Sequence, residues 1–188
     1  MRISRQSWLA AMLLVTATAA QIKPTDERSP CRDYKDVFAL FDRLGYTQQA
    51  WLAGIRDVPR VYLEDIPKRW REKGSTVIPV ADKKRLFFRL IAPIVLRINE
   101  LIAADRARAK AIMERLSLGE GVSPEDQAWL ADLAVRYKLI ASPGDRLDSD
   151  QYPELLLRVD IVPASLSLAQ AASESGWGTS RFAAEGNS

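Results

Sequence analysis

The stretch ADKKRLFFRLIAPIVLRINELIAADRARAKAIMERLS, residues 81–117, carries the longest periodic pattern in the chain. Its apolar residues recur at steps of three and four, the spacing of one helix face. They include Leu86, Leu90, Ile94, Ile98 and Leu101. The width of this face predicts a buried helix that forms the spine of the fold. Pro93 is expected to kink or split the helix, and the charged residues from Asp105 onward are expected to carry it out into solvent.

The segments on both sides of this stretch also have helical patterns. Residues 34–44 carry apolar side chains at helical spacing and end at Gly45. Ser123 and Pro124 form a typical helix start, with a capping side chain followed by proline at the first position. A further short helix is expected over residues 152–159. Because no sustained two-residue alternation occurs, the sequence predicts an all-α fold.

The first 20 residues have the order of a secretory signal peptide. Arg2 and Arg5 precede an apolar run at residues 8–15, and small residues follow at 17–20. The apolar run is short for a membrane span, and an uncleaved anchor is the alternative. The sequence therefore predicts an exported protein, periplasmic or associated with the cell envelope, with no stable membrane span after cleavage.

The composition excludes several kinds of chemistry. The chain has no histidine and a single cysteine, Cys31. A histidine-based catalytic triad, a zinc site of the usual Cys/His kind and an intramolecular disulfide are therefore excluded. No metal and no cofactor are expected. The formal net charge of +3 falls to +1 when residues 1–20 are removed, and no basic stripe with interleaved aromatics is present, so no nucleic-acid partner is expected.

The C-terminal stretch PASLSLAQAASESGWGTSRFAAEGNS, residues 163–188, places one acidic residue at the end of a helix of small residues. Pro163 suits a helix start, and Gly176 is a residue that commonly ends a helix in the left-handed conformation. Glu174 therefore lies in the last turn, where the carbonyl end of the helix disfavours negative charge. A partly desolvated carboxyl there would hold a proton near neutral pH, as a general acid must. The alternative is an ordinary surface glutamate.

The run Glu174-Ser175-Gly176-Trp177-Gly178 after an Ala-Gln-Ala helix resembles the bacterial glucosaminidase family, in particular its Bax-type members. Residues 85–106 are similar to the helical region of the same members. The resemblance covers residues 33–188 and is tightest in the last 40. It implies a helical N-terminal region followed by the first helices of a lysozyme-like glucosaminidase domain.

The same resemblance implies a function and roles for individual residues. The implied activity is a peptidoglycan hydrolase that cleaves the β-1,4 bond after an N-acetylglucosamine unit of the glycan strand, with Glu174 as the catalytic acid. Ser175 and Trp177 would help to shape the substrate cleft. The alternatives are a helix-end hydrogen bond for Ser175 and a core aromatic that locks the turn for Trp177. Gly176 and Gly178 are expected to be structural residues of the turn.

The sequence departs from the family at its C-terminal end. Family members continue past the equivalent of residues 186–187 into a second lobe that completes the cleft, whereas this sequence stops at Ser188. A chain truncated there is expected to hydrolyse little. Glycosidases use a second carboxylate or an assisting substrate group, and Glu185 is a candidate that no family motif supports.

Two other functions stay open. A lytic transglycosylase uses the same fold and a single glutamate, but it leaves an anhydro-muramyl end instead of a reducing end. A non-catalytic helical module that binds the cell wall would need no Glu174. In each case peptidoglycan is the expected partner.

The expected organisation has four segments. They are a signal peptide at residues 1–20, a linker at 21–33, a helical region at 34–148 and the incomplete N-terminal part of the glucosaminidase domain at 149–188.

Overall fold

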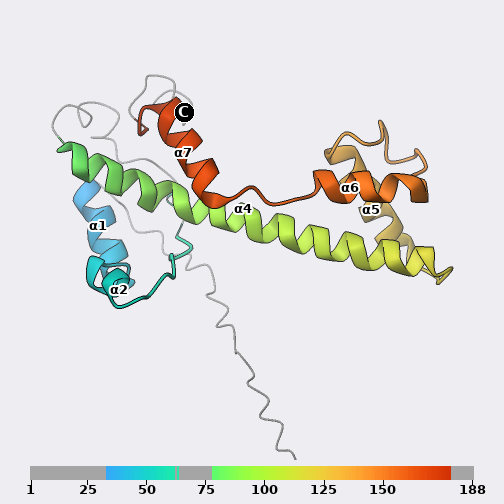
Figure 1. The fold of residues 1–188 in the computed structure, drawn as a ribbon, viewed down its shortest axis with the longest axis horizontal. Helices are drawn as coiled ribbons and strands as arrows, with labels where there is room; N and C mark the ends of the chain where they lie inside the picture. The colour runs from blue at the N-terminus through green and yellow to red at the C-terminus, as the bar shows by residue number, and fades with distance from the viewer. Residues whose placement is uncertain (1–32, 62, 64–77, 179–188) are drawn as a thin grey trace, which may run out of the picture.

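The computed structural model describes residues 33–61, 63 and 78–178. All the regular elements within these ranges are helical, so the all-α prediction is confirmed (Figure 1). The predicted signal peptide, Cys31 and Glu185 lie outside the described residues. The elements are α1 (Tyr34–Arg43), α2 (Gln48–Leu52), α4 (Val80–Ser117), α5 (Pro124–Arg136), the short 3₁₀ helix η2 (Ser149–Gln151), α6 (Tyr152–Arg158) and α7 (Ala164–Ser175).

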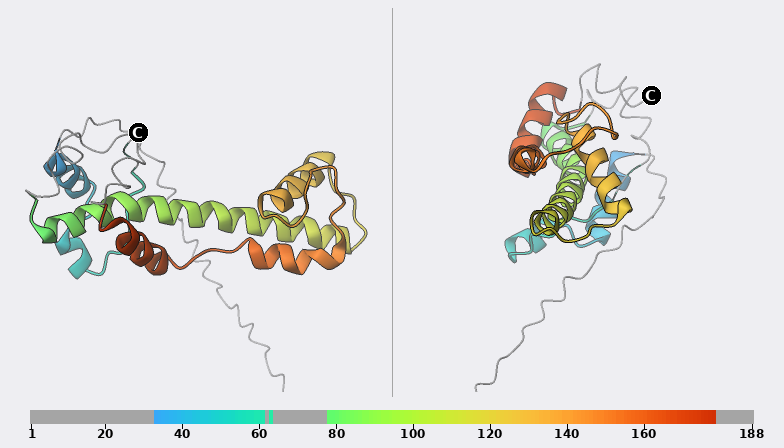
Figure 2. Two further views of the ribbon diagram at one scale, coloured as in Figure 1. Left: turned by 90° about the horizontal axis from the view of Figure 1, so that it is seen from above. Right: turned by 90° about the vertical axis from the view of Figure 1, so that its right-hand side faces the viewer.

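Helix α4 is the axis of the molecule. Its 38 residues correspond to a length of about 57 Å at 1.5 Å per residue. Helices α1, α2 and α7 gather around its first half, and α5 and α6 lie along its second half (Figures 1 and 2). Pro93 does not split the helix, which runs unbroken from residue 80 to residue 117. The Pro93 side chain is fully buried, so tertiary packing offsets the backbone hydrogen bond that proline cannot donate.

The first hydrophobic core joins α1 to the beginning of α4. Its buried members are Val37, Leu40, Phe41, Val61, Ile78 and Leu86. The buried guanidinium of Arg89 borders this core, donating to Asp42 Oδ1 at 3.0 Å and to the Tyr46 carbonyl at 3.2 Å. Its Cζ atom also lies 4.6 Å from the centre of the Phe38 ring. Burial lowers the pKa of Arg89, and the neighbouring Asp42 carboxylate opposes that effect.

The second hydrophobic core joins the end of α4 to α5 and α6. Its buried members are Ala109, Ile112, Met113, Leu130, Leu133, Ala134, Leu155 and Val159. The prediction that α4 runs out into solvent after Asp105 is therefore wrong. Ala109, Ile112 and Met113 are flanked by charged residues in the sequence, yet they share one side of the helix and pack under α5 and α6.

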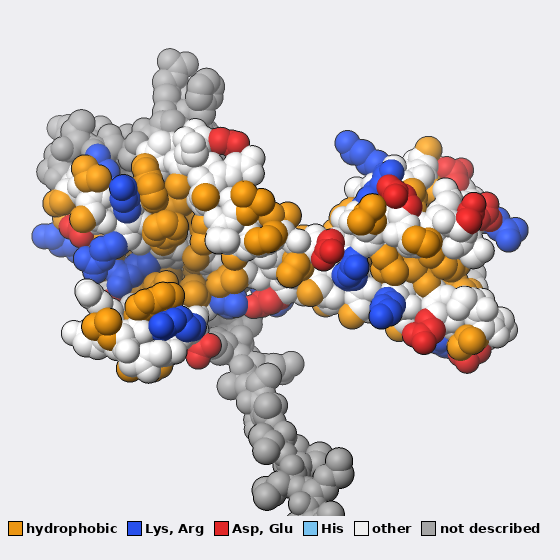
Figure 3. Space-filling view, viewed as in Figure 1, with side chains coloured by type: hydrophobic (Ala, Val, Ile, Leu, Met, Phe, Trp, Pro, Cys, Tyr) orange, Lys and Arg blue, Asp and Glu red, His pale blue; other side chains and the backbone are white. Residues whose placement is uncertain are grey.

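Between the two cores the predicted spine is uncovered. Ile94, Ile98 and Leu101 are 41%, 50% and 50% exposed, so the prediction that they are buried is wrong. Figure 3 shows the molecule narrowing here between two wider ends. The periodic spacing identified an apolar face correctly, but it could not show that no described element covers the middle of that face.

The local helix signals around α5 and α6 are confirmed. The Ser123 hydroxyl accepts a hydrogen bond from the Asp126 N–H at 3.1 Å, and α5 begins at Pro124. Helix α6 occupies the predicted short segment. Leu155 and Val159 from that segment lie in the core shared with α4 and α5.

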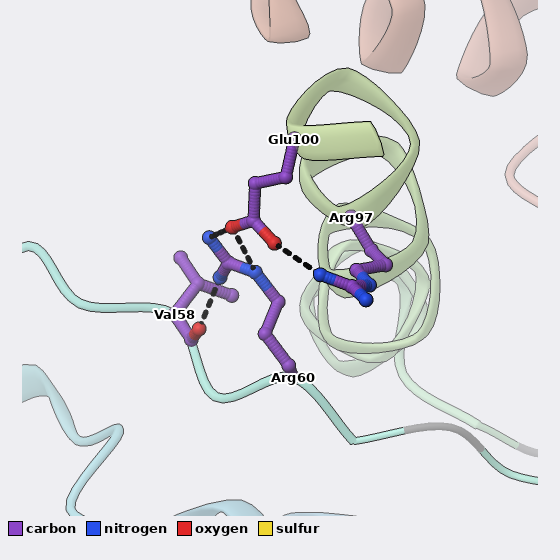
Figure 4. Close-up of polar contacts among 4 residues, drawn as sticks. All are labelled: Val58, Arg60, Arg97 and Glu100. Carbon is purple, nitrogen blue, oxygen red and sulfur yellow. Dashed lines mark hydrogen bonds and ion pairs between the residues drawn. The ribbon is translucent and has the colours of Figure 1, made fainter. Parts of the chain in front are cut away.

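A network of two arginines and one glutamate fastens the chain after α2 to the middle of α4 (Figure 4). Arg60 donates from Nε and Nη2 to Glu100 Oε1 at 2.9 and 2.6 Å. Arg97 donates to the other oxygen of Glu100 at 3.4 Å. Arg60 also donates to the Val58 carbonyl, which orients its guanidinium. The hydrogen bond from Arg60 is the main cause that lowers the pKa of Glu100.

The ion pairs of Glu100 predict that its contribution to stability depends on pH. Glu100→Gln is expected to lower the free energy of unfolding near neutral pH by less than about 1 kcal/mol, because both partners are partly exposed. Since the folded pKa of Glu100 is depressed, its contribution is present above the ordinary carboxyl pKa and is lost as the pH falls through the folded pKa. In urea melts, the free energies of unfolding of the parent and of Glu100→Gln should therefore differ less at about pH 3 than near neutral pH.

Asp132→Asn is the matched control, because Asp132 is exposed on α5 and no ion pair within the described ranges involves it. A difference between Glu100→Gln and the parent that stays constant from neutral pH to acid would contradict the assigned role.

Candidate active site

Helix α7 carries the glutamate that the sequence predicts as the acid. Pro163 stands immediately before it with φ −49° and ψ 126°, and the helix begins at Ala164. The preceding segment is held to α4, because Asn99 Nδ2 donates to the Val162 carbonyl at 2.7 Å. From there α7 packs against the first half of α4 (Figures 1 and 2), and its small residue Ala172 is buried.

The turn after α7 has three consecutive residues with positive φ. The values are 57° for Gly176, 63° for Trp177 and 76° for Gly178. Gly176 adopts the left-handed conformation that the sequence predicts, and the Trp177 N–H closes the helix on the Ala172 carbonyl at 2.9 Å. The positive φ of Trp177 was not expected from the sequence, because a bulky side chain rarely adopts it.

Ser175 makes the helix-end hydrogen bond that was the alternative to a role in the cleft. Its hydroxyl donates to the Ala171 carbonyl at 2.6 Å and accepts from the Gly178 N–H at 2.9 Å. The hydroxyl thus ties the last turn of α7 to the turn that follows. A contribution of Ser175 to substrate binding stays a prediction.

Trp177 fastens the turn to α4. Its ring makes edge contacts with Phe87 and Phe88, with centroids 5.6 and 5.7 Å apart and interplanar angles of 78° and 81°. Lys84 Nζ lies 4.9 Å from the centre of the same ring. The structure thus gives Trp177 the turn-locking role. Stacking of a sugar on its ring stays a prediction.

Glu174 lies on the exposed side of α7. Gln170, one turn earlier, donates from Nε2 to Glu174 Oε1 at 2.9 Å. The expected partial desolvation is not provided by the described residues, because the side chain leaves the helix away from the buried Ala172. The carboxyl is instead accessible to a large polymer and is oriented by a neutral amide.

Four residues that contact Glu174 or Trp177 were not predicted as site residues from the sequence. Gln170 stands four positions before Glu174, the spacing that brings side chains together on a helix. Phe87 and Phe88 are an adjacent aromatic pair in the long apolar segment, and Lys84 lies one turn before them. The spacing alone could have found Gln170, but nothing in the local sequence connects the α4 residues to a turn some 90 positions later.

Residues 33–61, 63 and 78–178 contain no cluster of three or more His, Cys, Asp or Glu side chains that could hold a metal ion. Among the helices described, none has the length and apolar character needed to cross a membrane.

Part of the chain is similar in sequence to a known protein. The chain is 37% identical over 105 residues to the protein named Protein bax of Escherichia coli strain K12. The aligned region covers 56% of this chain and 36% of Protein bax, so the chain spans about a third of the length of this curated relative. No family model and no solved structure matches the chain.

Proposed function

We propose that this chain, similar over just over half of its length to Protein bax, carries the catalytic acid of a peptidoglycan hydrolase of the glucosaminidase type. The observation that carries the proposal is the placement of Glu174. Its carboxyl stands exposed at the end of α7, Gln170 orients it, and the following turn is fixed on α4. The glucosaminidase-like motif around it supports the choice of a glycan as substrate.

In the proposed reaction Glu174 delivers a proton to the oxygen of a β-1,4 glycosidic bond that follows an N-acetylglucosamine unit. The bond between that oxygen and the anomeric carbon breaks as the proton arrives, so the oxygen leaves as a hydroxyl. Water then adds to the anomeric carbon to give a reducing end, and the proton that the water loses restores the acid form of Glu174. Such hydrolysis also needs a second carboxylate or an assisting group of the substrate, and we propose that a second lobe, as in the glucosaminidase family, completes this part of the cleft.

The products of wall digestion test this function. Residues 1–178 followed by the C-terminal lobe of a family glucosaminidase should release fragments from purified peptidoglycan that end in a reducing N-acetylglucosamine. Borohydride reduction followed by mass spectrometry identifies that end. Anhydro-muramyl ends would assign the lytic transglycosylase instead. Pelleting with the wall without any released fragment would assign the wall-binding module.

The proposed substrate lies outside the cytoplasmic membrane, so the proposal includes export. The signal-like pattern of residues 1–20 supports it. The mass of the protein recovered from the envelope fraction tests it, since loss of about the first 20 residues is expected and intact protein in the cytosol would contradict export.

A further inference from the structure

The turn that follows Glu174 has an unusual backbone conformation, and it has no role in the proposed reaction as described above. Trp177 has φ 63° between two glycines that also have positive φ. Glycine adopts such values freely, whereas a side chain as bulky as tryptophan rarely does. A conformation of this kind persists where its surroundings determine it, and such positions cluster at functional sites.

The surroundings that determine it come from α4. The rings of Phe87 and Phe88 contact the Trp177 ring from α4, and the Lys84 ammonium lies beside the same ring. Phe87 is 4% exposed and Phe88 is 38% exposed. A Cβ at Gly178 would also meet the Phe87 ring at 3.7 Å, so the backbone of the turn lies directly against this aromatic pair.

The turn is joined to the helix on both sides of Glu174. The Trp177 N–H donates to the Ala172 carbonyl, two positions before Glu174. The Ser175 hydroxyl, one position after it, links the Ala171 carbonyl to the Gly178 N–H. If Trp177 relaxed to negative φ, the chain would leave α7 in another direction and these hydrogen bonds would not all persist. The last turn of α7, which carries the Glu174 side chain, would then lose its fixed position.

We propose that Phe87 and Phe88 are positioning residues for Glu174. By holding Trp177 in its left-handed conformation, they fix the end of α7 and therefore the direction from which the carboxyl meets the glycosidic oxygen. The N-terminal helical region is then part of the catalytic apparatus, although none of its side chains touches the reacting atoms. The catalytic half of this inference rests on the proposed function, and the conformational half rests on the contacts alone.

The conformational half is tested on the chain itself. With 5-fluorotryptophan incorporated, the Trp177 signal in the ¹⁹F NMR spectrum is identified by its loss in Trp177→Phe. Phe88→Ala should move this signal toward its position in urea and broaden it. Phe88→Tyr, which keeps the ring, should leave it in place. Phe88 is preferred to Phe87 because its side chain is far more exposed, so its truncation is expected to leave the fold intact.

Ile94→Ala is the matched control. Ile94 lies on the same helix at 41% exposure, against 38% for Phe88, but the six-residue spacing puts it on a different side of α4. It should leave the Trp177 signal unchanged. An unchanged signal in Phe88→Ala, or an equal change in Ile94→Ala, would overturn the conformational half.

The catalytic half is tested in the hydrolysing fusion with a soluble glycan fragment. Phe88→Ala should lower kcat by about 10- to 100-fold, the effect of misplacing a catalytic group by about 1 Å, and leave KM within about twofold. Phe88→Tyr should restore kcat. A moved Trp177 signal with unchanged kcat would overturn the positioning role. Absence of hydrolysis by the unsubstituted fusion would overturn the proposed function and this catalytic half with it, while the NMR result would still decide whether α4 holds the turn.

Discussion

Glu174→Gln is expected to reduce hydrolysis of peptidoglycan by the fusion roughly 100- to 10,000-fold, the range that a positioned general acid contributes. Glutamine keeps the shape and polarity of the side chain, and its amide oxygen can still accept the hydrogen bond from Gln170. It cannot deliver a proton, however. Since Glu174 is exposed, a neutral amide there should leave the stability of the fold unchanged. Zymograms and the rate of reducing-end release measure the loss, and thermal melts check folding.

Glu154→Gln is a suitable control for this prediction. Glu154 is also a helical glutamate that accepts a hydrogen bond from a residue four positions away, in this case from Arg158 at 2.7 Å. It lies on α6, at the other end of the molecule from α7 (Figure 1). Hydrolysis should be retained in Glu154→Gln. Equal activity in the two variants would remove Glu174 from the chemistry.

The second large effect concerns stability. Leu133→Ala should lower the free energy of unfolding by about 2–5 kcal/mol, because the side chain is fully buried in the core between α4, α5 and α6. Ile98→Ala should cost less than about 1 kcal/mol, since its side chain is half exposed and loses little buried area. Urea denaturation followed by circular dichroism measures both. A cost for Ile98→Ala as large as that for Leu133→Ala would show that the middle of α4 is covered in solution.

The helices could be predicted from the sequence because their signals are local. The spacing of apolar residues predicted α4, the Ser123 side chain predicted the start of α5, and the glycine at 176 predicted the end of α7. Each signal depends on residues within one or two turns of one another. The same is true of the expectation that Ser175 bonds within its own helix end.

The features that could not be predicted depend on residues far apart in the sequence. Periodicity shows that Ile98 shares an apolar face, but the burial of that face depends on whether another element reaches it. Met113 looks solvated among charged neighbours, yet α5 and α6 return to cover it. Likewise, the positive φ of Trp177 is explained by Phe87 and Phe88, which the local motif does not contain.

The uncovered middle of α4 has a geometric consequence for how the chain specifies its shape. The two cores are joined through this helix, and each successive residue of a helix advances by about 1.5 Å and turns by about 100°. Adding or removing one residue between Pro93 and Ala109 would therefore turn one core by about 100° about α4 relative to the other. Ile102, which packs against the second core, would keep its contacts there only if the change came before it. The number of residues along α4 between the two cores thus sets the angle, about the helix axis, between the end that carries Glu174 and the end that carries α5 and α6.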